Sequence, residues 1–302
     1  MPYSATVSTN PVFTCGHGRQ TVGTPLLSGI SEESIFPELS SSIQIGAFSL
    51  CHYGEWLLGQ AQIPLTADLE TATHEIYGDL LRAASSHSLC RVWNYVPAIN
   101  APGTGAEENY RLFCLARSQA IESALGPDFP KHLPAASAVG TDTHSLSVIF
   151  AAHSGSVRHF ENPEQIPAYD YPPEHGPRSP SFARATVLTA SDATTTFISG
   201  TASIKGHSTS FPNNTPAQLA CTLDNLRLIS NSCGLGPDLA AEFATARHFK
   251  VYLRHAKDLA FVQTALSKDF LLPLDRVSYL RSDICRADLT LEIEATIFTP
   301  LK

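Results

Sequence analysis

The sequence lacks the features that mark several large classes of protein. It contains a single methionine and only 16% charged residues, and the formal net charge of its 302 residues is −8. An acidic chain is not typical of proteins that bind nucleic acid or anionic membranes. No run of about 18 apolar residues is present to span a bilayer, and the N-terminal MPYSATVSTN lacks the basic and apolar regions of a signal peptide. We therefore expect a cytoplasmic protein without nucleic-acid or membrane partners.

Signatures of metal, disulfide and nucleotide sites are also missing. The seven cysteines are scattered without CxxC spacing, and their odd number suits free thiols in a reducing compartment. The twelve histidines form no HExxH motif and no cluster with cysteine at metal-ligand spacing. SGTAS at 199–203 lacks the GxSxG pattern, and GLG at 234–236 follows a helix instead of a strand. The sequence therefore predicts neither a bound metal nor a cofactor.

What the sequence does contain is a substantial core and regular periodicity. Apolar residues make up 43% of the chain, and its length exceeds that of a typical single domain. Helical periodicity predicts helices over residues 69–81, 108–125, 216–232 and 258–268. The clearest strands are predicted over residues 91–97, 146–154, 249–255 and 289–298. Similar strand–loop–helix material in both halves favours an α+β fold with two related domains, residues 1–135 and 136–302.

Two segments carry polar side chains that admit two interpretations each. Tyr110 and Arg117 lie seven positions apart, two turns along one face of the predicted 108–125 helix. They can lie at the edge of an amphipathic helix, with their polar ends extended to the surface. They can instead bind a carboxylate, because its two oxygens accept hydrogen bonds from a guanidinium and a phenol. The long Pro-rich stretch at 161–184 can be a solvated connector or a wall against an anionic ring-shaped ligand. Its candidate side chains are Tyr169, Tyr171, Arg178 and Arg184.

The predicted final strand presents Glu292 and Glu294 on one face, opposite its apolar residues. On a half-buried sheet such a pair is solvent-facing. If another domain covered this face, desolvation would raise the pKa of a carboxyl there and keep it protonated, as a general acid requires. Cys285, seven residues before Glu292, reads by default as a structural thiol.

Seven segments in order along the chain resemble the chorismatase family, which includes chorismate hydrolases and 3-hydroxybenzoate synthases. The C-terminal half is also similar to the YjgF/RidA fold, in which a strand ending in SG precedes a helix with a TLDNL pattern and a last strand reading EIEA. The segments are RVWNYVPAIN, ENYRLFCLARSQAI, SAVGTD, ENPEQIPAYDYPPEHGPRSPSFARA, FISGTASIKGH, QLACTLDNLRLI and DICRADLTLEIEA.

The resemblance implies two YjgF/RidA-like (chorismate-mutase-like) domains in a pseudo-trimer-like arrangement, with the active site between them. It implies that the substrate is chorismate, that no cofactor is needed, and that the chain is a monomer or a weak homo-oligomer. It also supplies the domain that would cover Glu292.

Carried over position by position, the resemblance implies a catalytic role for Glu292 as the proton donor to the enolpyruvyl group. It implies a second catalytic position at Cys285. The substrate-binding positions it implies are Tyr110, Arg117, Tyr171, Arg184 and Ala202. Two of these positions disagree about the product. Cys285 resembles the branch that forms 3-hydroxybenzoate, where the cysteine lies near the reacting ring, whereas Ala202 is more similar to the hydrolase branch. We give more weight to Cys285 and expect chorismate to yield 3-hydroxybenzoate and pyruvate.

Three alternatives remain open at this level. The chain can be a chorismate hydrolase that yields 3,4-dihydroxycyclohexa-1,5-dienoate and pyruvate. It can be a RidA-like enamine or imine deaminase, in which Arg276 ahead of the last strand binds the substrate carboxylate. It can also be a binding module that has kept the fold and lost turnover.

Overall fold

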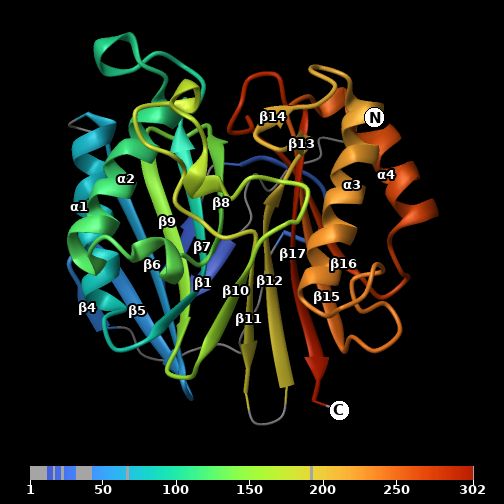
Figure 1. The fold of residues 1–302 in the computed structure, drawn as a ribbon, viewed down its shortest axis with the longest axis horizontal. Coiled ribbons are helices and arrows are strands. Elements are labelled where there is room, and N and C mark those ends of the chain that lie inside the picture. Colours follow the sequence, from blue (N-terminus) through green and yellow to red (C-terminus); the bar gives the residue numbers. More distant parts are fainter. Residues whose placement is uncertain are drawn as a thin grey trace, which may run out of the picture.

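The structure is a computed structural model that describes residues 12–15, 18–21, 24–31, 43–65, 68–190 and 193–301. Two large mixed sheets lie face to face near the middle of the molecule, and a pair of helices covers the outer side of each (Figure 1). Helices α1 and α2 cover the first sheet, and α3 and α4 cover the second. The helices span Leu69–Ala83, Asn109–Leu125, Thr215–Ser232 and Leu259–Asp269.

The first sheet has the strand order β4-β5-β6-β9-β7-β8, and the second has the order β10-β11-β12-β17-β15-β16-β3. In the first sheet the strands in that order span Ile43–Ile45, Phe48–Tyr53, Trp56–Pro64, Ser145–His153, Ser88–Pro97 and Ala135–Thr141. In the second they span Val157–Phe160, Ala185–Thr189, Ala193–Thr201, Leu291–Pro300, Ala246–Leu253, Arg276–Arg281 and Leu26–Gly29. Two small hairpins accompany them, β1–β2 and β13–β14, with strands at Val12–Cys15, Gly18–Thr21, Ile204–Lys205 and Ser208–Thr209.

The two sheets repeat one topology. Along the chain, three strands are followed by a helix, a strand, a second helix and two strands, first as β4 to β9 and again as β10 to β17, with the β13–β14 hairpin inserted in the second repeat. In each repeat the last strand lies between earlier strands and is antiparallel to both, while the strands that flank the second helix pair in parallel. The expectation of two related α/β units is therefore confirmed.

The sheets divide the chain at a different place from the predicted boundary between residues 135 and 136. That boundary falls at the start of β8, which pairs in parallel with β7. Strand β9 then pairs with both β6 and β7, so both strands complete the first sheet. The chain passes to the second sheet between His153 and Val157, and β3 from the N-terminal part adds to the edge of the second sheet. Pairing between distant strands decides this division, and no local pattern reports it.

The predicted helices and strands are found with small shifts at their ends. Helix α1 begins after Asp68, whose side chain accepts a hydrogen bond from the Thr71 amide at 2.9 Å. Helix α2 ends at Gly126, which has φ of +75°, a conformation that favours glycine. Strand β17 buries Leu291, Ile293, Ala295 and Ile297 in the core against α3 and α4, as its alternation predicted.

Three apolar clusters hold the layers together. One lies between the first sheet and its helices, and a second between the second sheet and its helices. The third lies between the two sheets and includes Trp93, Phe197 and Tyr252. The inner face of each sheet is therefore covered by the other sheet, which is the condition that the sequence left open for Glu292.

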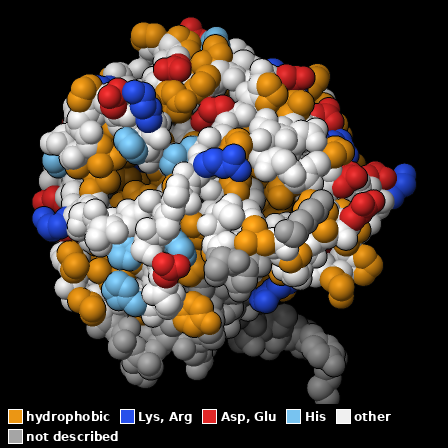
Figure 2. Space-filling view, turned by 60° about the horizontal axis from the view of Figure 1, so that its bottom comes forward, with side chains coloured by type: hydrophobic (Ala, Val, Ile, Leu, Met, Phe, Trp, Pro, Cys, Tyr) orange, Lys and Arg blue, Asp and Glu red, His pale blue; other side chains and the backbone are white. Residues whose placement is uncertain are grey.

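The cysteines of the chain are not all free thiols. Among the described residues, Cys90, Cys114, Cys221, Cys233 and Cys285 are free, whereas Cys51 is disulfide-bonded, so the expectation of free thiols throughout is wrong there. Residue spacing does not report which cysteines the fold brings together. Among the helices of the described residues, none combines the length and apolar character needed to cross a bilayer. On the face seen in Figure 2, basic and acidic side chains are scattered among each other, and several histidines lie around a hollow.

Candidate active site

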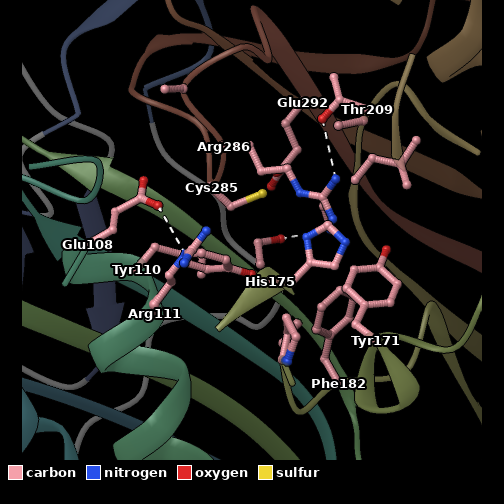
Figure 3. A pocket seen from close by; sticks show the side chains of 18 of the residues that line it. Glu108, Tyr110, Arg111, Tyr171, His175, Phe182, Thr209, Cys285, Arg286 and Glu292 are labelled. Atoms are coloured by element: carbon pink, nitrogen blue, oxygen red, sulfur yellow. Dashed lines mark hydrogen bonds and ion pairs between the residues drawn. The ribbon is translucent and has the colours of Figure 1, made fainter. Parts of the chain in front are cut away.

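A cavity of ≈ 500 Å³ opens between the two repeats. The first repeat contributes side chains of α2 and β8, and the second contributes the 161–184 loop, the end of β12 and the segment that leads into β17 (Figure 3). All seven residues that the family resemblance assigns to the site line this one cavity: Tyr110, Arg117, Tyr171, Arg184, Ala202, Cys285 and Glu292.

Glu292 lies on the inner face of β17 and is only 3% exposed. Burial raises the pKa of its carboxyl to about 8, with a further increase from the nearby charge of Glu294; Arg91 and Arg184 act in the opposite direction. Its Oε1 atom has no hydrogen-bond partner among the described residues. At neutral pH this side chain is therefore a protonated acid that faces a cavity.

Glu294 is also buried on this face, but its carboxylate is fully engaged. Arg91 Nη2 and Trp93 Nε1 each donate a hydrogen bond to it at 2.7 Å, and Lys250 Nζ lies 3.1 Å from Oε1. The Ser137 hydroxyl donates to its Oε2 atom. Glu294 thus anchors a charged cluster between the sheets and does not line the cavity, whereas Glu292 does.

A bulge in β12 makes room for the Glu292 carboxyl. The register of β12 against β17 shifts between Ile198 and Thr201, at the Ser199–Gly200 step. A Cβ atom on Gly200 would overlap Oε1 of Glu292, so any side chain there would displace the carboxyl from its position. Sequence reasoning used the SG pair only as part of a resemblance and missed that Gly200 shapes the site.

Arg117 does not snorkel to the surface, as one interpretation of the α2 helix held. It is 2% exposed, and its guanidinium lies over the rings of Tyr77 at 5.3 Å and Phe113 at 5.9 Å. Among the described residues it forms no ion pair with a carboxylate, and its Nε atom has no hydrogen-bond partner. A buried cation without an acidic partner is costly, so a site that retains one is suited to an anionic ligand.

The 161–184 loop forms a wall of the cavity and is not a solvated connector. Arg184 Nη2 donates a 2.7 Å hydrogen bond to the Tyr171 hydroxyl, and the Arg184 guanidinium lies 5.1 Å from the Phe182 ring. Two of the loop's candidates do not reach the cavity: Arg178 pairs with Glu122 of α2 at 2.9 Å, and Tyr169 packs against the first core.

Cys285 and Tyr110 face each other across the cavity near Glu292 (Figure 3). Burial and the neighbouring Glu292 raise the pKa of the Cys285 thiol to about 12, so it stays protonated at neutral pH. Burial likewise raises the pKa of the Tyr110 hydroxyl. Both groups are therefore neutral, and Cys285 can shape the cavity or donate a weak hydrogen bond, but it is not poised as a thiolate nucleophile.

The structure adds cationic residues that sequence reasoning missed. Arg286 follows Cys285 directly, lies 5.5 Å from the Tyr171 ring and donates to Thr209 Oγ1 at 3.3 Å. Arg111 of α2 also lines the cavity. The only signal for Arg286 was its place beside a residue already singled out. Arg276, the carboxylate-binding residue of the deaminase alternative, is exposed and does not line the cavity.

The cavity therefore combines one protonated carboxyl with several guanidinium groups. The arginines lie on both repeats, so a ligand with two separated carboxylates can be bound at both ends. A neutral acid between them can deliver a proton to such a ligand.

Comparison with known proteins identifies the family. A family model described as Chorismatase FkbO/Hyg5-like, N-terminal, matches residues 37–152, which end within β9. A 3-hydroxybenzoate synthase from Streptomyces hygroscopicus is 35% identical over 261 residues, which cover 82% of this chain and 75% of that protein. A chorismatase from Streptomyces rapamycinicus is 35% identical over 252 residues, which cover 80% of this chain and 75% of that protein.

A solved structure gives the same result for the fold. A chorismatase crystal structure matches with a TM-score of 0.79 and 30% identity, over 86% of this chain and 80% of that chain. A YjgF-family protein from Neisseria meningitidis matches 49% of this chain and 96% of its own, at 16% identity and a TM-score of 0.32. The fold and the sequence together show that the chain belongs to the chorismatase family.

Proposed function

We propose that this chain converts chorismate into 3-hydroxybenzoate and pyruvate, with Glu292 as the acid that starts the reaction. The observation that carries the proposal is the buried Glu292 carboxyl, with its pKa raised to about 8 and its Oε1 atom unpaired among the described residues. The relatives named above supply the substrate, because they are a 3-hydroxybenzoate synthase and a chorismatase.

Chorismate suits the cavity in size and charge. A volume of ≈ 500 Å³ falls in the range of about 300–1,000 Å³ typical of small-ligand sites. One carboxylate of the substrate would pair with Arg117, which has no acidic partner among the described residues. The other would lie on the side of Arg184 and Arg286, where Tyr171 holds both guanidinium groups in place.

The first step is a proton transfer from Glu292 to the methylene carbon of the enolpyruvyl group. Protonation of an enol ether gives an oxocarbenium ion, and the acid must be neutral in the resting enzyme to supply the proton. The carboxylate left behind lies near Arg184 and Arg91, which lower its pKa and so stabilise its charged form.

In the second step the 4-hydroxyl oxygen of the ring attacks the neighbouring carbon that carries the side chain. The bond from this carbon to the ether oxygen breaks, and pyruvate leaves as a ketone. The arene-oxide-like intermediate then opens and aromatises, and the ring proton that it loses restores the acid form of Glu292. The atoms of chorismate are divided between the two products, and no water is consumed.

Ala202 favours the second candidate, a hydrolase. In that route water attacks the oxocarbenium carbon, and the products are pyruvate and 3,4-dihydroxycyclohexa-1,5-dienoate. Ala202 and Cys285 both line the cavity, so both are placed to influence the ring. The neutral Cys285 thiol would favour the intramolecular route by filling space that an attacking water needs, and the test must therefore identify the ring product.

The proton-transfer role is tested with Glu292→Gln, which keeps the size of the side chain and removes the acid. We expect pyruvate release to fall by about 10²–10⁴-fold, because general acid catalysis contributes an effect of this order and the substituted amide has no acid proton to give. Thermal unfolding and chorismate binding should be retained. Glu75→Gln, on the exposed face of α1, is the matched control. Near-normal turnover by Glu292→Gln would exclude this role.

The product assignment is tested by chromatography of the ring product from the wild type and from Cys285→Ala. We expect 3-hydroxybenzoate from the wild type, and a larger share of the diene diol from Cys285→Ala, because the smaller side chain admits water. The diene diol as the main wild-type product would reject the synthase assignment in favour of the hydrolase. Release of no pyruvate at all would reject both.

A further inference from the structure

The mouth of the cavity is roofed by two segments that are far apart in sequence. The 161–184 loop is bonded to the β13–β14 hairpin by hydrogen bonds from the Ile166 amide to the Gly206 carbonyl at 3.0 Å and from the Gly206 amide to the Glu164 carbonyl at 2.9 Å. Gln165 Nε2 adds a bond to the Ile204 carbonyl at 2.8 Å. The hairpin turn is therefore held firmly against the loop.

Three metal-ligating side chains meet where these segments touch. Glu174 and His175 come from a short 3₁₀ helix, Pro173–His175, and His207 comes from the hairpin turn. His175 Nε2 lies 2.9 Å from His207 Nδ1, and Glu174 Oε1 lies 3.6 Å and 3.4 Å from these two nitrogens. The proton-transfer mechanism uses none of them.

The three ligand atoms have the separations of ligands around one ion. With metal–ligand bonds of about 2.0–2.1 Å, two vertices of a tetrahedral zinc site lie about 3.3–3.4 Å apart. The observed triangle, with edges of 2.9, 3.4 and 3.6 Å, matches this geometry. We propose that Glu174, His175 and His207 bind a divalent transition-metal ion of the Zn²⁺ class, with the remaining position open to solvent or to a ligand.

Both imidazole rings pack against one neighbour, Tyr171. The Tyr171 ring lies 5.1 Å from the His175 ring and 6.4 Å from the His207 ring, and its hydroxyl is fixed by Arg184. Two imidazoles and one carboxylate are a donor set that suits Zn²⁺ and not Mg²⁺, which prefers oxygen ligands.

Arg286 is the main opposing feature, because its positive charge lies close to His175 (Figure 3). Three contacts limit this repulsion. The Arg286 guanidinium faces the Tyr171 ring and Thr209, and Glu174 places a negative charge directly on the proposed ion. The site also lies at the protein surface, where water screens the remaining repulsion.

A bound ion would join the loop to the hairpin at the entrance of the cavity. Glu174 and His175 line the cavity, whereas His207 does not. An ion held by these two lining residues would occupy space at the edge of the cavity and hinder the entry of substrate, so we expect Zn²⁺ to lower kcat/KM.

The test is calorimetric titration of the full-length protein with ZnCl₂ at pH 7.5, with MgCl₂ titrated in parallel. We expect one Zn²⁺ site per chain, no Mg²⁺ binding at the same concentrations, and a loss of Zn²⁺ affinity of about a hundredfold or more in His207→Gln, since even changes beyond the ligands cost about 10–100-fold. His255→Gln, an exposed histidine outside the cluster, is the matched control and should bind Zn²⁺ as the wild type does.

Equal Zn²⁺ affinity in the wild type and in His207→Gln would overturn the proposed site. The absence of Zn²⁺ binding to the wild type at 100 µM would overturn it as well, because this concentration is about ten times a micromolar-range Kd. If saturating Zn²⁺ leaves kcat/KM unchanged, the ion does not hinder the entry of substrate, and that part of the proposal is wrong. Because the titration needs no substrate, its outcome does not depend on the proposed reaction.

Discussion

Glu292 and Glu294 lie on the same face of β17, and their different surroundings separate their functions. Glu294 is surrounded by Arg91, Lys250 and Trp93, which hold it as an anion. Glu292 has no such donors on its Oε1 atom among the described residues. The charge on Glu294 raises the pKa of Glu292 by repulsion, so the anchored carboxylate helps to keep its neighbour protonated.

A pH–rate profile should show the proton on Glu292. With the pKa of this carboxyl near 8, the acid form predominates at neutral pH, and activity should fall about tenfold per pH unit above that value.

The raised pKa of Glu292 also makes the stability of the fold depend on pH. The folded chain holds a proton that the unfolded chain releases above its ordinary pKa of 4.5, so this contribution to stability is fully present below 4.5 and is lost as pH rises through about 8.

Removing the charge of Glu294 should move the alkaline limb of the pH–rate profile, where activity falls. We expect Glu294→Gln to shift the fall in kcat to lower pH by about one unit or more, because the repulsion is lost while Arg91 and Lys250 keep their positive charges. The same change destabilises the fold by about 3–5 kcal/mol, since it leaves buried cations without their partner. The profile must therefore be measured well below the unfolding temperature of the variant.

Trp93→Phe is the matched control for Glu294→Gln. It removes the 2.7 Å hydrogen bond from Trp93 Nε1 and keeps the charge on Glu294. The control should lose stability without a shift of the limb to lower pH. If Glu294→Gln is active and its limb coincides with that of the wild type, then Glu294 has only a structural role.

At the scale of single elements, the β12 bulge makes room for the carboxyl of Glu292, the proposed acid. Gly200→Ala places a methyl group where Oε1 of Glu292 lies, and the carboxyl must move. A displacement of about 1 Å costs on the order of 10²-fold in rate, so we expect kcat to fall about a hundredfold with a smaller change in KM. Steady-state kinetics with chorismate measure both constants.

Gly78→Ala in α1 serves as the control for Gly200→Ala. A Cβ on Gly78 meets nothing within 4 Å, and this helix lies on the outer face of the first sheet. Alanine in a helix is favoured over glycine by about 1 kcal/mol, so this variant should gain stability and keep wild-type activity. Comparable activity in the two variants would mean that the bulge does not position Glu292.

The regular elements were predictable because their side chains follow a period. The alternation of β17 placed Glu292 and Glu294 opposite Leu291 and Ile293, as the structure shows. The chemistry of that face was not predictable from the strand, because it depends on what covers it. Local patterns could not report that β8 lies across from Gly200, nor that the fold brings His207 to His175. The seven site residues came from the family resemblance, and the added Arg286 and Gly200 came only from the structure.

At the scale of the whole molecule, the repeated topology shows how the two units have diverged. In β15 the residue paired with Glu292 is Tyr252, and in β7 a tyrosine, Tyr95, is paired with Ser147. Strands β7 and β15 occupy equivalent places in the two sheets, so Ser147 stands where the second repeat has Glu292. Ser147 is fully buried and accepts a hydrogen bond from Gln62, so the first repeat has a buried hydroxyl at the position that corresponds to the proposed acid.

The shared core between the sheets predicts that both repeats unfold together. The two tryptophans of the chain, Trp56 and Trp93, both lie in the first sheet and contact Phe197 of the second, so tryptophan fluorescence reports on the first sheet and on its contact with the second. Leu226 of α3 is fully buried in the outer core of the second sheet, away from both tryptophans.

Leu226→Ala should lower the free energy of unfolding by about 2–5 kcal/mol, because truncation of a buried leucine loses apolar contacts and leaves a cavity. If the inter-sheet cluster couples the repeats, the midpoint of urea unfolding followed by fluorescence should fall in this variant by the same amount as the midpoint followed by circular dichroism. A fluorescence midpoint that stays at the wild-type value while the dichroism midpoint falls would mean that the repeats fold independently, and the cavity between them would then rest on docking and not on a common core.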